Sequence, residues 1–136
     1  MFNNLNIVVG ITGGIAAYKA CGIVSFLKGQ GANVDVIMTK NACEFITPLT
    51  LETLSGNKVV TDMFERPNYI DVKHISLARK ADLFLIVPAT ANIIGKVANG
   101  IADDMLTTTV MATNAKVLIA PAMNTNMFEN PIVQDN

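Results

Sequence analysis

The stretch LNIVVGITGGIAAYKACGIVSFLKGQGANVDVIM, residues 5–38, decides the fold. It begins and ends with short runs rich in Val, Ile and Leu, at 5–11 and 33–38, which are typical of strands buried in a parallel sheet. Between these runs apolar residues recur at helical spacing until glycines end the pattern (Ala16, Ala20, Ile23, Val24 and Leu27, then Gly29 and Gly31). The stretch therefore predicts a strand–helix–strand unit.

The rest of the chain continues the same alternation. Two further apolar runs, DLFLIVP at 82–88 and AKVLIAP at 115–121, predict two more strands. Helices are expected over 40–55 with a break at Pro48, over 92–99 and over 102–113, whereas 56–73 is expected to be irregular. Alternating strands and helices predict an α/β protein with an open, doubly wound parallel sheet and helices on both faces. At 136 residues the chain fits one domain.

The composition narrows the possible partners. Apolar residues make up 51% of the chain and charged residues 15%, so we expect other copies of the chain to cover part of its surface. The scattered charges sum to −1 and give no footprint for nucleic acid. No apolar run approaches the roughly 20 residues that span a bilayer, and Cys21 and Cys43 lack the spacing of metal ligands. We expect a cytoplasmic homo-oligomer that binds no nucleic acid, membrane or metal.

Ligands of open parallel sheets bind at the carboxyl ends of the strands. The loops expected there contain small and polar residues and few bulky charges, which suits a flat, uncharged ring system with a phosphate at one end. These loops are GITGG (10–14), TKNACEF (39–45), PATAN (88–92) and PAMNTNM (121–127).

The first loop indicates a mononucleotide. Gly13 and Gly14 begin a helix, where they either permit a tight turn or bind phosphate through backbone N–H groups, and we favour phosphate binding. The spacing Gly10-x-x-Gly13-Gly14 is not the dinucleotide fingerprint, which also needs an acid at the end of the second strand. Asp35 falls in the middle of that strand, and Thr39, whose hydroxyl could bond a phosphate oxygen, occupies its end. The sequence therefore favours a mononucleotide over NAD.

Three polar residues near the later loops are candidates for chemistry. Asn92 and Asn124 end the PATAN and PAMN motifs, where they are turn residues or supply an uncharged amide beside a redox ring. His74 is the only histidine, and Asp71 could cap a short helix that holds His74 in its first turn. There the imidazole could exchange a proton near neutral pH. Spacing alone leaves open whether His74 is an acid–base group or a structural residue, which is the commoner case.

Five motifs together resemble the flavin-containing cysteine decarboxylases, and within them the phosphopantothenoylcysteine decarboxylase domain of bacterial coenzyme A synthesis. The likeness covers almost all of the chain. It implies a Rossmann-like, flavodoxin-like flavoprotein that binds FMN, forms homotrimers or dodecamers with active sites between subunits, and decarboxylates 4'-phosphopantothenoylcysteine to 4'-phosphopantetheine. The motifs are GGIAAYK (13–19), FITPLTLETLSG (45–56), HISL (74–77), PATANIIGKVANGIADDMLTT (88–108) and PAMNTNMFENPIVQ (121–134).

The resemblance also implies a role for individual residues. Three residues would bind the phosphate of FMN, and five others would lie against its flavin ring. In the substrate site, His74 would be the acid–base residue beside the thiol, Asn124 would bind the carboxylate, and Met127 would help to form the pocket. The residues at the phosphate would be Gly13, Gly14 and Thr39, and the residues at the flavin ring would be Thr90, Ala91, Asn92, Ile93 and Ala122.

The resemblance leads us to expect a truncated domain, and it leaves alternative functions open. In the family, a flap that carries a cysteine follows the NPIVQ region, whereas this sequence stops at Asn136. We therefore expect residues 1–136 to be an FMN-binding decarboxylase domain that is truncated before the substrate flap. The alternatives are a related peptidyl-cysteine decarboxylase and a non-catalytic flavin-binding subunit. A prenylated-flavin-forming relative would be expected to lack the PAMN motif.

Overall fold

The structure is a computed structural model that describes residues 1–61, 63, 64 and 73–136. Within these residues, four parallel strands form one sheet in the order β2-β1-β3-β4, which confirms the predicted fold class. The strands are β1 (Asn6–Ile11), β2 (Asn33–Met38), β3 (Leu83–Ala89) and β4 (Lys116–Pro121). The helices are η1 (Ile15–Tyr18), α1 (Lys19–Gly29), α2 (Ala42–Phe45), α3 (Pro48–Ser55), α4 (Lys73–Lys80), α5 (Ala91–Ala98), α6 (Met105–Ala112), α7 (Thr125–Glu129) and α8 (Pro131–Asp135).

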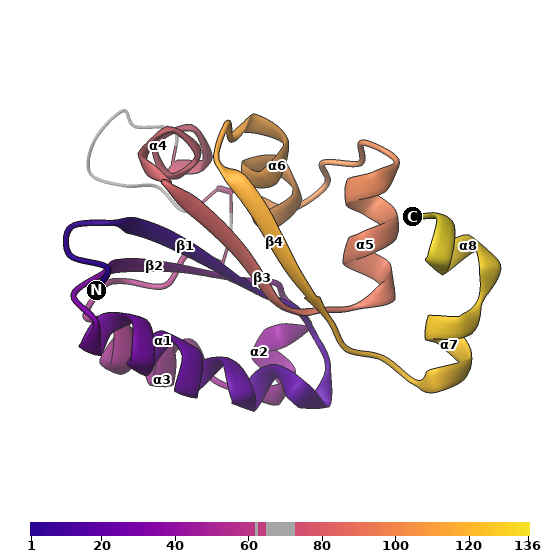
Figure 1. Ribbon diagram of the computed structural model, residues 1–136, viewed down its shortest axis with the longest axis horizontal. Helices are drawn as coiled ribbons and strands as arrows, with labels where there is room; N and C mark the ends of the chain where they lie inside the picture. Colours follow the sequence, from indigo (N-terminus) through magenta and orange to yellow (C-terminus); the bar gives the residue numbers. More distant parts are fainter. Residues whose placement is uncertain (62, 65–72) are drawn as a thin grey trace.

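Helices cover both faces of the sheet and give the molecule three layers (Figure 1). On one face, η1, α1 and α3 pack against side chains that include Val9 and Val36. On the other face, α4, α5 and α6 pack against Val8, Phe84 and Ile86. Neighbouring residues of one strand therefore lie in different cores. This explains why the strands read as continuous apolar runs rather than as alternating patterns.

The predicted elements agree with the observed ones to within a few residues. The expected break at Pro48 separates α2 from α3. The helix expected over 102–113 begins later, directly after Asp104, because a capping box starts it there. The Asp104 carboxylate accepts the backbone N–H of Thr107 at 2.8 Å, and the Thr107 hydroxyl accepts the backbone N–H of Asp104 at 3.1 Å. Much of the segment 56–73, expected to be irregular, lies outside the described residues.

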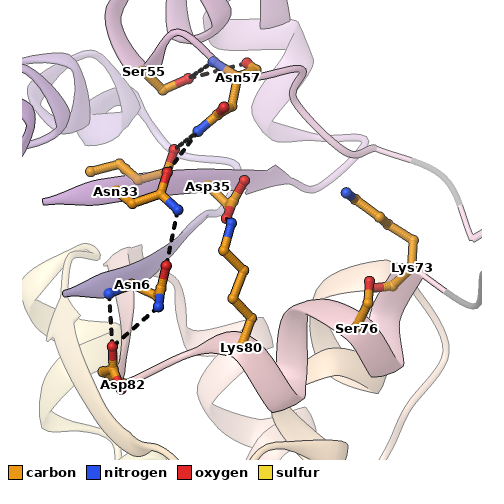
Figure 2. A network of polar contacts seen from close by, with 10 residues as sticks. Asn6, Asn33, Asp35, Ser55, Asn57, Lys73, Ser76, Lys80 and Asp82 are labelled. Carbon is orange, nitrogen blue, oxygen red and sulfur yellow. Dashed lines mark hydrogen bonds and ion pairs between the residues drawn. The ribbon is translucent and has the colours of Figure 1, made fainter. Parts of the chain in front are cut away.

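A relay of polar side chains joins the amino ends of three strands (Figure 2). The Asp82 carboxylate, just before β3, accepts the backbone N–H of Asn6 on β1 at 2.8 Å. The Asn6 side-chain oxygen accepts from the Asn33 amide on β2 at 2.9 Å, and the Asn57 amide donates to the Val34 carbonyl at 2.7 Å. These bonds fix the relative positions of β2, β1 and β3 at the edge of the sheet where the strands begin.

Strand β4 lies at one side of the sheet, and its residues are exposed in the single chain. It pairs with β3 in parallel, yet Val117, Leu118 and Ile119 keep between 41% and 61% of their surface accessible. A strand edge that carries exposed apolar side chains is uncommon on a monomer because it invites association.

Candidate functional site

A pocket of about 890 Å³ lies where the loops that follow the four strands meet. This volume falls within the range of pockets for cofactors and small molecules, about 300–1,000 Å³. Every residue predicted for the site lines the pocket, except His74. The lining residues among those predicted are Gly13, Gly14, Thr39, Thr90, Ala91, Asn92, Ile93, Ala122, Asn124 and Met127.

The loops after β1 and β2 form one end of the pocket. Gly13 approaches the β2 loop so closely that a Cβ atom at this position would lie 2.4 Å from the Cβ of Asn41, so only glycine fits. Gly14 precedes the first turn of η1, and within the described residues no side chain caps that turn. Thr39 accepts the backbone N–H of Ala42 at 3.1 Å through its hydroxyl oxygen. Its hydroxyl proton can therefore be donated to a ligand, as an anionic oxygen requires.

The loop after β3 and the first turn of α5 form a second wall of the pocket. Thr90 caps α5, because its hydroxyl oxygen accepts the backbone N–H of Ile93 at 3.3 Å. Ile93 is buried beneath the pocket, whereas Asn92 is exposed to it. The backbone N–H of Ala122 donates to the carbonyl of Ala89 at 3.0 Å, which holds the β4 loop against this wall.

The β4 loop presents an oriented amide. The Asn124 side-chain oxygen accepts the backbone N–H of Asn126 at 2.9 Å and so caps α7. The oxygen of the amide is therefore engaged, and its NH₂ group can donate to an acceptor in the pocket. A carboxylate is such an acceptor.

His74 lies apart from this pocket. It is the second residue of α4, so it lies in the first turn of a helix as expected, and it is half-buried. Asp71, its expected cap, lies outside the described residues. Helix α4 packs against α6, and the chain's own pocket does not include the histidine.

Sequence reasoning missed several pocket residues, among them Thr12, Lys40, Lys96 and Asp104. Lys96 could have been found, since it lies one helical turn after Asn92 and so on the same face of α5. Its ammonium group donates to both oxygens of Asp103, at 2.8 and 3.1 Å. This hydrogen bond lowers the pKa of the Asp103 carboxyl. Thr12 and Lys40 lie in the loops GITGG and TKNACEF, which were expected at the site, but the sequence does not single them out within those loops.

The lining residues fit a flat, neutral ring with an anionic end. Charged side chains in the pocket are limited, among the described residues, to Lys40, Lys96 and Asp104. No cluster of His, Cys, Asp and Glu that could hold a metal ion occurs in the described part of the chain. Cys21 and Cys43 are half-buried, and burial raises the pKa of both thiols, which favours their protonated form.

Comparison with known proteins decides the family. A sequence model of the Flavoprotein family matches residues 1–136, the whole chain. The chain belongs to the Flavoprotein family. This flavoprotein is 54% identical over its full length to the coenzyme A biosynthesis bifunctional protein CoaBC of Bacillus subtilis (strain 168), of which it covers 34%. It is 44% identical over 132 residues to a probable phosphopantothenoylcysteine decarboxylase of Streptococcus mutans, of which it covers 74%.

Solved structures support the same assignment. The FMN-dependent cysteine decarboxylase SpaF superposes with a TM-score of 0.92 at 34% identity, over 99% of this flavoprotein and 78% of that chain. A PPC decarboxylase variant in complex with pantothenoylaminoethenethiol superposes with a TM-score of 0.82 at 31% identity, over 98% and 75% of the two chains. The flavoprotein spans about a third of the length of the CoaBC proteins. In the described residues, no helix has the length and apolar character needed to cross a membrane.

Proposed function

We propose that this flavoprotein domain binds FMN and decarboxylates 4'-phosphopantothenoylcysteine to 4'-phosphopantetheine in coenzyme A synthesis. The observation that carries the proposal is that the glycine loop after β1 and the PATAN and PAMN loops after β3 and β4 line one shared pocket. The likeness to CoaBC and to a probable phosphopantothenoylcysteine decarboxylase supports this substrate.

FMN would bind with its phosphate at Gly13, Gly14 and Thr39. The free amides of the η1 turn and the Thr39 hydroxyl proton are donors suited to a phosphate. The flavin would lie against Thr90, Ala91, Asn92, Ile93 and Ala122. When bound, FMN supplies reversible two-electron oxidation of the cysteinyl side chain, which gives the electrons of the breaking C–C bond an acceptor.

The substrate would be held by Asn124 and Met127. The free NH₂ group of Asn124 would donate to the carboxylate that leaves as CO₂ and is replaced by a proton. His74 would hold and return the proton of the cysteinyl thiol, as a positioned imidazole can near neutral pH.

A homotrimer, or a dodecamer built from trimers, would bring His74 to the pocket of a neighbouring copy. The position of His74 outside its own chain's pocket supports a site completed by another subunit. The exposed apolar side chains of β4 support association. We place the assembly in the cytoplasm, where a small-molecule enzyme of this class would work.

A peptidyl-cysteine decarboxylase is the second candidate. The specific observation in its favour is the structural likeness to the peptidyl-cysteine decarboxylase EpiD, which superposes with a TM-score of 0.83 at 28% identity. The two candidates share the pocket and differ in the substrate that enters it.

One experiment separates these functions. The FMN-loaded protein is mixed without oxygen with either phosphopantothenoylcysteine or a peptide that ends in cysteine, while flavin absorbance between roughly 370 and 450 nm and product mass are followed. We expect reaction with phosphopantothenoylcysteine alone, seen as flavin bleaching and a product that has lost CO₂ together with the two hydrogens whose electrons the reduced flavin holds. Where those electrons return to the product, the flavin regains its absorbance and the product has lost CO₂ only. Reaction of the peptide alone would favour the second candidate, and a folded protein that takes up no FMN would refute both.

A further inference from the structure

Thr12 lies between the two walls of the pocket and touches both. It follows the last residue of β1, lines the pocket, and is 2% exposed. Its hydroxyl donates to the carbonyl of Pro88 at 2.5 Å and accepts the backbone N–H of Thr90 at 3.1 Å. One hydroxyl group thus uses its proton and a lone pair to join the β1 loop to the β3 loop.

The hydroxyl of Thr12 joins β1 and β3 beyond the point where their backbone pairing ends. The parallel pairing of β1 with β3 ends at Gly10 and Ile86. Two residues later β3 carries Pro88, which has no N–H group to donate. Beyond this point a side chain must supply the missing donor and acceptor if the ends of β1 and β3 are to stay joined.

The bonds of Thr12 continue into the first turn of α5. Thr90, whose N–H donates to Thr12, accepts the N–H of Ile93 and begins the helix. The hydrogen bonds of Thr12 therefore help to fix the positions of Ala91 and Asn92, which face the pocket.

The other loops are joined differently. Gly13 meets Asn41 by close packing, and Ala122 meets Ala89 through a backbone bond. Among the described residues, Thr12 is the one side chain whose hydrogen bonds link two of these four loops. A backbone bond survives substitution, whereas this link depends on the hydroxyl of one residue.

We infer that Thr12 is a positioning residue for FMN: its hydroxyl fixes the distance between the phosphate end of the site at Gly13 and Gly14 and the flavin wall at Thr90–Ile93. This inference rests on the proposed binding of FMN. Without the hydroxyl, the walls of the pocket also adopt other separations, and the apparent affinity for FMN becomes the intrinsic affinity multiplied by the fraction of molecules that can bind.

The test compares Thr12→Ala and Thr12→Val with Thr12→Ser, which keeps the hydroxyl. FMN affinity is measured on apoprotein by quenching of flavin fluorescence, and the environment of the ring by visible circular dichroism of the bound flavin. We expect Ala and Val to weaken FMN binding about tenfold and to change the dichroism, because buried bonds are lost at the wall. Thr12→Ser should remain within about threefold of the parent.

Thr109→Val is the matched control. Thr109 is also fully buried, and its hydroxyl donates to the Met105 carbonyl at 2.6 Å, but it lies in α6 and does not line the pocket. It should lower stability without altering FMN affinity or dichroism.

Three outcomes would overturn the inference. They are parent-like binding and dichroism in Thr12→Ala, equal losses in Thr12→Ser and Thr12→Ala, or an equal loss in Thr109→Val. If Thr12→Val fails to fold, the Ser and Ala variants, which differ by one hydroxyl, give the answer. A parent protein that binds no FMN would instead refute the proposed function, and this inference with it.

Discussion

At the scale of single residues, the two lysines of the pocket differ in their surroundings. Lys96 is held by Asp103, which compensates its charge. Lys40 follows Thr39 directly, and no ion pair joins it to any carboxylate of the described residues. Its charge is therefore available to an anion at the phosphate end of the site.

Replacing Lys40 should reveal whether it attracts the phosphate of FMN. We expect Lys40→Gln to weaken FMN binding about threefold at low salt, since exposed ion pairs contribute little and are screened by salt. Riboflavin, which has no phosphate, should bind the variant and the parent equally. The control is Lys28→Gln, which removes an exposed charge from the last turn of α1. An equal loss of riboflavin affinity in Lys40→Gln would contradict a charge effect.

Asn124 allows substrate binding to be separated from folding. Asn124→Asp keeps an oxygen that can cap α7, so the protein should fold and bind FMN, but it places a negative charge against the substrate carboxylate. We expect KM to rise about tenfold or more, because juxtaposed like charges are costly. Asn130→Asp is the matched control, since Asn130 caps α8 with the same 2.9 Å bond and does not line the pocket. Similar KM values for the two variants would argue against a carboxylate site at Asn124.

At the scale of elements, the sequence predicts the order of strands and helices because each strand is a short apolar run. It also predicts which loops meet, since the carboxyl ends of parallel strands share one edge of the sheet. What it does not predict is contact between distant residues. Thr12 bonds to Pro88, 76 positions away, and no periodicity indicates that partner. The position of His74 relative to the pocket is likewise a matter of how α4 packs, which spacing does not specify.

An ion pair between elements provides a test of packing. Asp35, which the sequence places in the middle of β2, binds the ammonium group of Lys80 on α4 at 2.8 Å, and its side chain is 13% exposed (Figure 2). Asp35→Asn should lower the free energy of unfolding by about 1–2 kcal/mol, because a mostly buried carboxylate loses its charge-assisted hydrogen bond to Lys80. Asp103→Asn should cost less, because the Asp103 carboxylate that pairs with Lys96 is 53% exposed and solvent screens the pair. Urea denaturation measures both, and equal costs would mean that burial of Asp35 is unimportant.

At the scale of the whole molecule, the apolar surface and the position of His74 both bear on self-association. Exposed apolar side chains gather on β4 and recur on α7 and α8, as at Phe128 and Ile132. We expect sedimentation equilibrium at micromolar concentration to give a multiple of the 14.5 kDa chain mass, with three as the smallest unit. A mass of one chain would contradict the proposed trimer.

His74 and Asn124 can be tested as two parts of one site shared between copies. His74→Asn alone should leave FMN bound but slow flavin reduction by substrate about 10²–10⁴-fold, the range for loss of a positioned acid–base group. Asn124→Asp alone should also show slow flavin reduction, because this variant binds the substrate weakly. If His74 of one copy serves the pocket of another, a mixed oligomer of the two variants contains some sites with both native residues.

Random mixing of equal amounts would make about a quarter of such sites native, because each must draw its histidine and its asparagine from the right partner. The variants are mixed under conditions that exchange subunits, and flavin reduction is followed without oxygen. A fast phase of about a quarter of the parent's amplitude is expected, and it should be absent when each variant is assayed alone. If His74 instead acted within its own chain, no site in the mixture would hold both native residues and no fast phase would form. The amplitude of that phase therefore distinguishes a shared site from a self-contained one, whatever the size of the assembly.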